Sequence, residues 1–399
     1  MKFRKQLQHV PAALAAAAVL AGCGGGGGAA APGNAPGTLV LSPQSQSLLA
    51  LDAANLPDYT PQLPPHYAGA AENTPPGAVG SPVVAALGRV LFHDRQLSVN
   101  GAVSCASCHK QTEDFGDGRR FSTGFDGGLT TAHAMRLANI RFFQPGTMFW
   151  DKRAPSLEAQ ASLPIQHPVE MGFDAAHGGM PALVQKLQAV PYYADLFTGA
   201  FGDPAVTEER MQQALSQFMR AMVSTNSRWD DAFAQVFDPT LPDKGVNKPL
   251  PGFTEEENRG RALFMASRAE GGQACAACHQ PPSFALGNSG SNGLDAGEAR
   301  RFKSASLKNV ARSSAFMHDG RFSTLEDVVE HYSTGVQDGP GLDGRLKGAD
   351  GQPLRPSFSP QDKAALVAFL RTLSDPVLAA DPRFASPFRA DAVPSVAAR

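Results

Sequence analysis

Two copies of one short motif carry the residues whose types and spacing suggest chemistry. Residues 105–109 read Cys-Ala-Ser-Cys-His, and residues 275–279 read Cys-Ala-Ala-Cys-His. In a C-x-x-C-H motif the two thiols can bond covalently to haem, and the histidine can bind the iron from the proximal side. The sequence therefore predicts two c-type haems. The attachment residues are expected to be Cys105, Cys108 and His109 for the first haem, and Cys275, Cys278 and His279 for the second.

Two other uses of paired cysteines compete with haem attachment. A thioredoxin-like redox motif and a zinc site both employ C-x-x-C. Neither requires a histidine directly after the second cysteine in both copies. The chain has five cysteines, and the two motifs use every one except Cys23. This usage favours haem.

Cys23 ends a segment that resembles a bacterial export signal. Lys2, Arg4 and Lys5 are positive, and residues 12–21 form an apolar run that is too short to span a bilayer. Leu-Ala-Gly before Cys23 resembles a lipobox, whose cysteine is lipidated and becomes the new N-terminus. The alternative is an ordinary cleaved signal. We expect a signal peptide over 1–22 and a periplasmic protein anchored to a bacterial membrane by lipid on Cys23 only.

Length and composition favour two exported domains behind a linker. With 399 residues and 42% hydrophobic residues, two domains with real cores are expected. The formal net charge of -2 gives no reason to propose a nucleic acid partner. Residues 23–80 are rich in Gly, Pro and Ala and lack sustained periodicity, which predicts a flexible tether.

Helix signals dominate the rest of the chain. Ser81-Pro82 and Ser359-Pro360 each offer an N-cap followed by proline at the first helical position. Thr254 and Thr324 precede two more helical patterns, and Glu257 completes a capping box for the first of them. Strand signals are few. The expected fold is mainly α.

The two halves repeat each other. Gly-Arg-Val-Leu-Phe at 88–92 precedes the first cysteine motif, and Gly-Arg-Ala-Leu-Phe at 260–264 precedes the second. Further matches follow in the same order and at similar spacing. We therefore predict two c-type cytochrome-like domains from an internal duplication. The expected bounds are 81–250 for the first domain, 251–375 for the second and 376–399 for a tail.

The repeat also predicts what faces each iron from the distal side. Aligning the halves on Leu157 and Leu325 places Pro164 opposite Tyr332. Proline cannot bind iron, whereas tyrosinate can. This indicates an open, reactive first haem and a closed second haem. The alternative for Tyr332 is a tyrosine packed in the core. The other candidate ligands for the second iron are Met317, His318 and His331.

At this point the chain resembles the bacterial di-haem cytochrome c peroxidases, including the MauG branch. The resemblance covers about residues 81–375. Its motifs are Leu-Gly-Arg-x-Leu-Phe before the first haem, Phe-Trp-Asp-Lys-Arg-Ala at 149–154, Pro-Val-Glu-Met-Gly at 168–172 and Met-His-Asp-Gly at 317–320.

The resemblance implies a role for each matching residue. The first haem would react with peroxide, with Glu170 as distal acid/base, Gln160 as distal glutamine and Pro164 lining the pocket. Trp150 would relay electrons between the haems. Tyr332 falls where the MauG branch has an axial tyrosine and conventional peroxidases a methionine. Taken singly, Glu170 could be a surface carboxylate and Trp150 a packing residue.

The sequence departs from the family pattern in the loop after the first motif and near the expected calcium site. Conventional members cap the resting first iron with a loop histidine. Residues 116–128 contain none, and Phe125 lies near its place. His133 is the nearest candidate for that cap. His133 also replaces the asparagine of the calcium site, and Ser-Ser-Ala at 313–315 replaces Thr-Ala-Pro. Calcium is therefore in doubt. His167 replaces a usual Asn or Asp beside the pocket.

Four functions are compatible with these residues. The leading hypothesis is an enzyme that reduces hydrogen peroxide to water with electrons from a small periplasmic donor, either a cytochrome c or a copper protein. The second is a MauG-type oxidase that uses a high-valent di-haem state to oxidise a protein or another substrate. The third is a non-catalytic di-haem electron carrier, against which Glu170, Gln160 and Pro164 count. Oxygen-dependent cleavage of a polymer is the fourth.

Overall fold

The computed structural model describes residues 37–78 and 80–390. The expected signal peptide and Cys23 lie outside these residues. Among the described helices, none combines the length and the apolar character needed to cross a membrane.

The described part of the chain is mainly α, as predicted, and its only β structure consists of isolated bridges. The helices are α1 (Pro43–Leu48), α2 (Pro82–His93), α3 (Cys105–Cys108), α4 (Leu157–Ser162), α5 (Gly179–Gln188), α6 (Pro191–Phe201), α7 (Glu208–Arg220), α8 (Arg228–Val236), α9 (Glu255–Met265), α10 (Leu325–Glu330), α11 (Pro360–Arg371) and α12 (Pro376–Ala380).

The four expected helix starts are confirmed. Ser81 caps α2 and Ser359 caps α11, in each case with proline at the first helical position. Thr254 forms a capping box with Glu257 at the start of α9. Thr324 forms one with Asp327 at the start of α10. Each cap satisfies backbone N–H groups that a helix start leaves without a partner.

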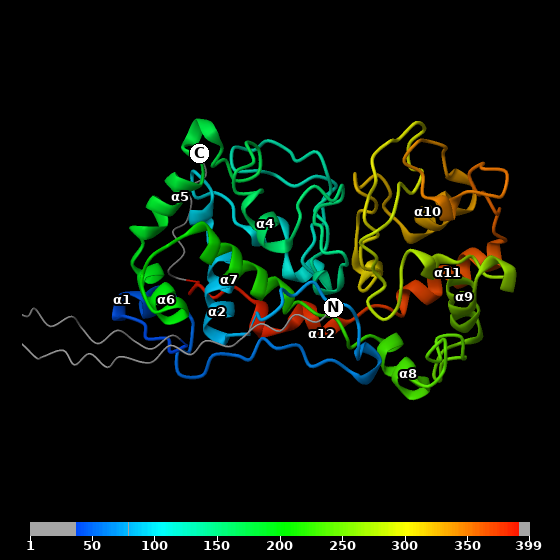
Figure 1. Ribbon diagram of the computed structural model, residues 1–399, viewed down its shortest axis with the longest axis horizontal. Coiled ribbons are helices and arrows are strands. Elements are labelled where there is room, and N and C mark those ends of the chain that lie inside the picture. Colours follow the sequence, from blue (N-terminus) through cyan, green and yellow to red (C-terminus); the bar gives the residue numbers. More distant parts are fainter. Residues whose placement is uncertain (1–36, 79, 391–399) are drawn as a thin grey trace, which may run out of the picture. The chain divides into compact units, whose positions relative to one another are not determined.

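The duplication is visible in how the helices pack. In the first half α2 crosses α7, and in the second half α9 crosses α11 (Figure 1). At both crossings the residue at the point of contact is a glycine, which has no side chain to separate the two helices. A Cβ on Gly88 would lie 2.0 Å from the Ala214 carbonyl oxygen, and a Cβ on Gly260 would lie 1.9 Å from that of Ala365. Both glycines lie in the repeated segment just before a cysteine motif, so both halves share one packing device.

The loops that follow the motifs are duplicated as well. Asn139 and Asn309 both adopt left-handed backbone conformations, with φ of 63° and 62°, and a short 3-10 turn follows each. Further on, Phe149 and Met317 also have positive φ, at 67° and 74°. The backbone therefore supports the alignment on Leu157 and Leu325, which also pairs Trp150 with His318.

The expected tether is wrong for residues 38–78. Leu39, Leu49 and Tyr67 are buried in this segment. The His66 ring is also buried and lies 3.3 Å from the carboxylate of Asp230. These anchors are few and irregularly spaced. They pack onto helices from elsewhere in the chain, so the segment shows no periodicity of its own.

The boundary between the halves and the tail also differ from expectation. Helix α8 was assigned to the first domain, yet Trp229 packs in the second core, 4.7 Å from the Phe284 ring centroid. The second domain therefore begins near residue 227 rather than 251. The expected tail returns to the first half, where Phe384 is buried against Phe218 and Arg89 donates to the Ala385 carbonyl.

Alanine at either crossing glycine is expected to destabilise the protein by about 1–3 kcal/mol, because the added methyl group meets backbone that cannot move aside. Helix propensity alone predicts the opposite sign, since alanine is favoured over glycine by roughly 1 kcal/mol in a helix interior. Urea unfolding of Gly88→Ala and Gly260→Ala measures the effect. Gly344→Ala is the control, because a Cβ there meets nothing within 4 Å. Equal stability of all three variants would contradict the close crossings.

Candidate functional site

Each cysteine motif forms a short helical turn that presents its histidine in one tautomer. The first motif is α3, and the second begins with a 3-10 turn at Cys275–Ala277. His109 Nδ1 lies 2.8 Å from the Phe115 carbonyl oxygen, and His279 Nδ1 lies 3.3 Å from that of Phe284. A carbonyl only accepts, so Nδ1 must carry the proton. The Nε2 lone pair is then available to a metal.

Burial supports the same protonation state. It lowers the pKa of His109, and it lowers the pKa of His279 to about 4, so both rings are neutral near pH 7. The thiols of the two motifs are free and partly buried. Burial raises the pKa of the Cys105 thiol to about 12, with Cys108 and Glu170 adding to the effect. Unpaired thiols beside a neutral histidine suit covalent haem attachment.

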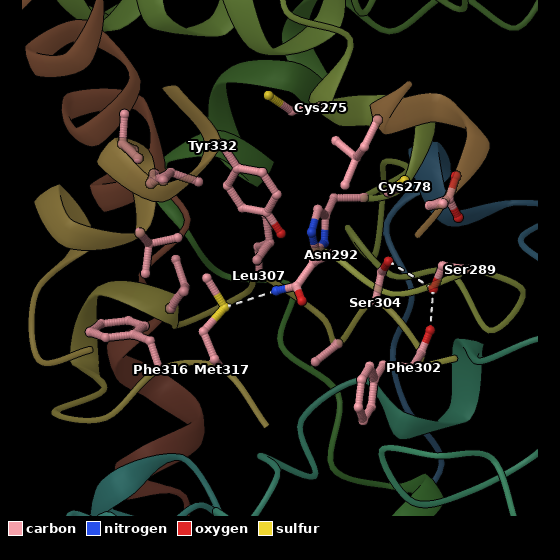
Figure 2. A pocket seen from close by; sticks show the side chains of 18 of the residues that line it. Cys275, Cys278, Ser289, Asn292, Phe302, Ser304, Leu307, Phe316, Met317 and Tyr332 are labelled. Carbon is pink, nitrogen blue, oxygen red and sulfur yellow. Dashed lines mark hydrogen bonds between the residues drawn. The ribbon is translucent and has the colours of Figure 1, made fainter. Parts of the chain in front are cut away.

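An apolar cavity surrounds the second motif. Cys275, Cys278 and His279 line it, as do Tyr332 and Met317. Figure 2 shows the Tyr332 and Met317 side chains entering this cavity beside Asn292. The Met317 sulfur accepts a hydrogen bond from the Asn292 amide at 3.2 Å.

Tyr332 is placed by an irregular turn of helix. After α10 the chain forms a π-helical turn, His331–Gly335, which contains Tyr332. Such turns recur at functional sites. Burial, and after it the Cys278 thiol, raises the pKa of the Tyr332 phenol. A phenolate here therefore needs a compensating positive charge, which an iron ion would supply.

The two histidines named as candidate ligands of the second iron, His331 and His318, make different contacts. His331 is buried, and its Nε2 lies 3.0 Å from the Asn292 carbonyl oxygen. His318 lines the cavity but stacks on Phe302, with ring centroids 4.2 Å apart. The structure thus brings Tyr332, Met317 and His318 to the cavity, while His331 supports its wall.

Two basic residues of the cavity were missed by the sequence reasoning. Lys303 is 3% exposed, and its ammonium donates to the Met148 sulfur at 3.4 Å. Its ammonium lies 4.0 Å from the Phe143 ring centroid, and burial lowers its pKa to about 7. The Nε of Arg136 is buried without a hydrogen-bond partner. Buried cations require anions, and the two propionates of a haem would provide them. Isolated basic residues give no sequence signal for this role.

Glu170 lies near the first motif, where it contributes to the raised pKa of both cysteine thiols. Burial raises the pKa of Glu170 itself, and the positive charge of Arg153 opposes this. His167 Nδ1 accepts the backbone N–H groups of Val169 and Glu170, both at 3.3 Å. Its Nδ1 lies 3.7 Å from the Glu170 carboxylate. His167 therefore positions the segment that carries Glu170.

The other residues expected around Glu170 come from α4 and the turn after it. Gln160 is on α4 and Pro164 follows that helix, and both are partly buried. The Pro164 carbonyl accepts the N–H of His167 at 3.3 Å, which joins this turn to the Glu170 segment. Phe125, at the place of the missing loop histidine, donates its backbone N–H to the Glu170 carbonyl at 3.0 Å.

Trp150 lies where the two halves meet. It lines the cavity of the second motif, although its chain segment belongs to the first half. Its Nε1–H donates to the His133 carbonyl at 2.8 Å, and its own carbonyl accepts the N–H of Lys303 at 2.9 Å. These bonds attach Trp150 to the His133 loop of the first half and to Lys303 of the second half.

His133 occupies a structural position. Its Nδ1 lies 3.0 Å from the Arg119 carbonyl oxygen, and its N–H donates to the His318 carbonyl. The ring lines the second cavity. At the other expected calcium segment, the Ser313 hydroxyl donates to the Ala315 carbonyl at 2.9 Å. The doubt about calcium, drawn from the sequence, stays a prediction.

Comparison with known proteins agrees with this geometry. The sequence profile of the di-haem cytochrome c peroxidase family matches residues 82–236 and 254–364, so it covers both motifs and implies two haems. The methylamine utilization protein MauG of Methylorubrum extorquens is 34% identical over 310 residues, which are 73% of this chain and 78% of MauG.

Two further relatives extend the comparison. The cytochrome c551 peroxidase of Nitrosomonas europaea is 28% identical over 312 residues, which are 73% of this chain and 80% of that protein. The crystal structure of a MauG-like protein associated with microbial copper homeostasis superposes with a TM-score of 0.63. It is 29% identical and covers 84% of this chain and 98% of its own.

Replacing Tyr332 with phenylalanine is expected to raise the reduction potential of the second haem, because an anionic axial ligand stabilises ferric iron. Met317→Leu is the matched control at the same cavity and is expected to leave the potential near that of the wild type. Spectroelectrochemical titration of the haem-loaded protein measures both. A large shift in Met317→Leu without one in Tyr332→Phe would make Met317 the ligand.

Proposed function

We propose that this chain, which belongs to the di-haem cytochrome c peroxidase family, reduces hydrogen peroxide to water with electrons from a small periplasmic donor. The observation that carries the proposal is Glu170, a partly buried carboxylate with a raised pKa beside the first cysteine motif. The donor would be a cytochrome c or a copper protein.

The first haem would be held by Cys105, Cys108 and His109, and it would supply an iron to which peroxide can bind. Pro164 offers no group that could occupy that position. Glu170 would accept the proton of the peroxide oxygen nearest the iron and return it to the oxygen that leaves as water. Two electrons and two further protons complete the reduction of one peroxide to two waters.

The neighbours of Glu170 would serve its positioning. His167 holds the backbone N–H of Glu170, and the Gly124 backbone packs directly on the same segment. A Cβ on Gly124 would lie 1.6 Å from the Val169 carbonyl oxygen. Gln160, from α4, would orient the bound peroxide. Together these contacts limit how far the carboxylate can move from the first motif.

Electrons would reach the first motif by way of the second. Cys275, Cys278 and His279 would hold the second haem, and Tyr332, which lines the same cavity, would be a further ligand of its iron. Trp150 lines the second cavity and is bonded to the loop that carries His133. An indole fixed between two redox centres can shorten each electron-transfer step. We propose this relay role for Trp150.

A MauG-type oxidase is the second candidate. Tyr332 favours it, because a tyrosine rather than a methionine follows α10 inside the cavity. Such an enzyme would use the high-valent di-haem state that peroxide generates to oxidise a protein or another bulky substrate. Rapid peroxide turnover with reduced cytochrome c would support the peroxidase. Slow turnover with a long-lived oxidised state would support the oxidase. Glu170 counts against a pure electron carrier, because electron transfer alone does not require an acid/base group.

The Glu170→Gln variant is expected to react with peroxide about 10²–10⁴-fold more slowly, because it lacks the proton acceptor. In the wild type the carboxylate is the active form. Since burial raises its pKa above the ordinary 4.5, the rate should fall as pH drops through that raised value. Glu170→Gln should lose this pH dependence.

Stopped-flow mixing of the oxidised, haem-loaded protein with peroxide between pH 4 and 8 measures these rates. Glu209→Gln is the control, because Glu209 lies exposed on α7 of the same half. A full rate and an unchanged pH profile in Glu170→Gln would remove Glu170 from the mechanism.

We also propose a periplasmic location with a lipid anchor on Cys23. The Cys23→Ala variant should move from the membrane fraction to the soluble fraction of its host, because a lipid chain is the only anchor that the sequence predicts. Incorporation of labelled palmitate into the wild type, but not into the variant, provides the direct measurement. Labelling of both proteins would contradict the assignment.

A further inference from the structure

A pair of buried tyrosines beside the first motif has no part in the proposed function. Tyr192 and Tyr193 are neighbours on α6, and their side chains are 6% and 0% exposed. Their ring centroids are 4.8 Å apart, with an interplanar angle of 50°. Two phenols at this separation can exchange an electron readily.

Both hydroxyl groups donate to the same oxygen of a buried carboxylate. The distances to Asp94 Oδ2 are 2.6 Å from Tyr192 and 2.7 Å from Tyr193. The other oxygen of Asp94 accepts the N–H of Gln96 at 2.8 Å. Asp94 is 5% exposed. The ammonium of Lys186, whose charge lowers the pKa of Asp94, donates its hydrogen bond to the Ser98 carbonyl.

Helix α2, whose C-cap is Asp94, packs against both α6, which carries the tyrosine pair, and α3, which is the first haem-attachment motif. Cys105 packs against the buried cluster that contains Tyr193. Burial, then Asp94 and, more weakly, Cys105 raise the pKa of Tyr193, which places the phenol within electrostatic reach of that thiol. Asp94 itself is eleven residues before Cys105, at the end of α2.

The other tyrosines lack such an acceptor. The chain has five tyrosines. The Tyr59 hydroxyl is buried without a partner. The Tyr67 hydroxyl bonds only to the carbonyls of Ser224 and Pro282, which cannot take a proton. Tyr332 is the proposed iron ligand. A phenol is oxidised easily only when its proton can leave with the electron. Of the five tyrosines, Tyr192 and Tyr193 are therefore the ones placed for such oxidation.

We propose that Tyr193 and Tyr192, with Asp94 as proton acceptor, form a redox-active pair that donates an electron to the first haem after peroxide has reacted there. The proposal rests on the proposed function, which supplies the oxidant. Tyr193 loses one electron to the oxidised haem and its proton to the Asp94 carboxylate. The products are a neutral tyrosyl radical, a protonated Asp94 and a haem reduced by one electron.

The surroundings of Asp94 suit this step. Burial raises the pKa of Asp94 against the hydrogen bonds of the two tyrosines, so the carboxylate accepts a proton more readily than one in water. Tyr192 can then share the radical with Tyr193 through the contact of their rings. The pair would hold an oxidising equivalent when no external donor arrives, away from the Trp150 route.

The test adds one equivalent of hydrogen peroxide to the oxidised, haem-loaded protein without any donor and freezes the sample for EPR. A radical signal that narrows when all tyrosines are ring-deuterated is expected. The Tyr192→Phe/Tyr193→Phe double variant should lose most of it, and Asp94→Asn should lose it as well, although Asn keeps the side-chain size. Tyr67→Phe is the matched control and should keep the full signal.

Each outcome separates the two proposals. If peroxide changes the ferric haem signals neither in the oxidised protein nor after one-electron reduction, the peroxide-based function is wrong, and the proposed tyrosine pair is overturned with it. If the ferric signals disappear but the radical is absent, or survives in the double variant, only the tyrosine pair is overturned. Loss of the radical signal in Tyr67→Phe would place the radical on Tyr67 and would overturn the proposal for Tyr192 and Tyr193.

Discussion

In each half of this protein two helices touch backbone to backbone, and the haem site is built outward from that contact. Gly88 and Gly260 permit the approach because they place no methyl group against the facing carbonyl. A short 3-10 turn and a loop connect each glycine-bearing helix to its cysteine motif, over residues 94–104 in the first half and 266–274 in the second. The crossing therefore sets where each motif begins, and the motif histidine then meets a carbonyl that fixes its tautomer.

The duplicated backbone carries different chemistry in its two copies. Trp150 and His318 follow equivalent left-handed residues, yet the indole joins the two halves while the imidazole stacks on Phe302. Likewise, Pro164 and Tyr332 come after equivalent helices, α4 and α10. Since the backbone positions are shared, the difference between an open and a closed iron site would reside in single side chains. A duplication can diverge in this way without losing its packing.

The local signals in the sequence predicted the local structure well. The caps at Ser81, Thr254 and Thr324 mark helix starts because capping depends on residues within one turn. The repeat located the matching segments because duplicated backbone keeps its spacing. What the sequence could not show was packing between distant segments. Tyr67 looks like part of a linker until its contacts are known. Lys303 and the Asp94 tyrosine pair likewise acquire meaning only from neighbours far along the chain.

The charges around the aromatic residues suggest why an oxidising equivalent would pass through one and rest on another. Lys303 is tied to Trp150 by a backbone hydrogen bond and lines the same cavity. The Trp150 indole N–H donates to the His133 carbonyl, which cannot take its proton. Tyr193 has the opposite setting, because Asp94 can accept the phenolic proton and leave a neutral radical. In the proposed mechanism Trp150 is therefore oxidised only transiently, whereas the tyrosine pair can retain an oxidising equivalent as a longer-lived radical.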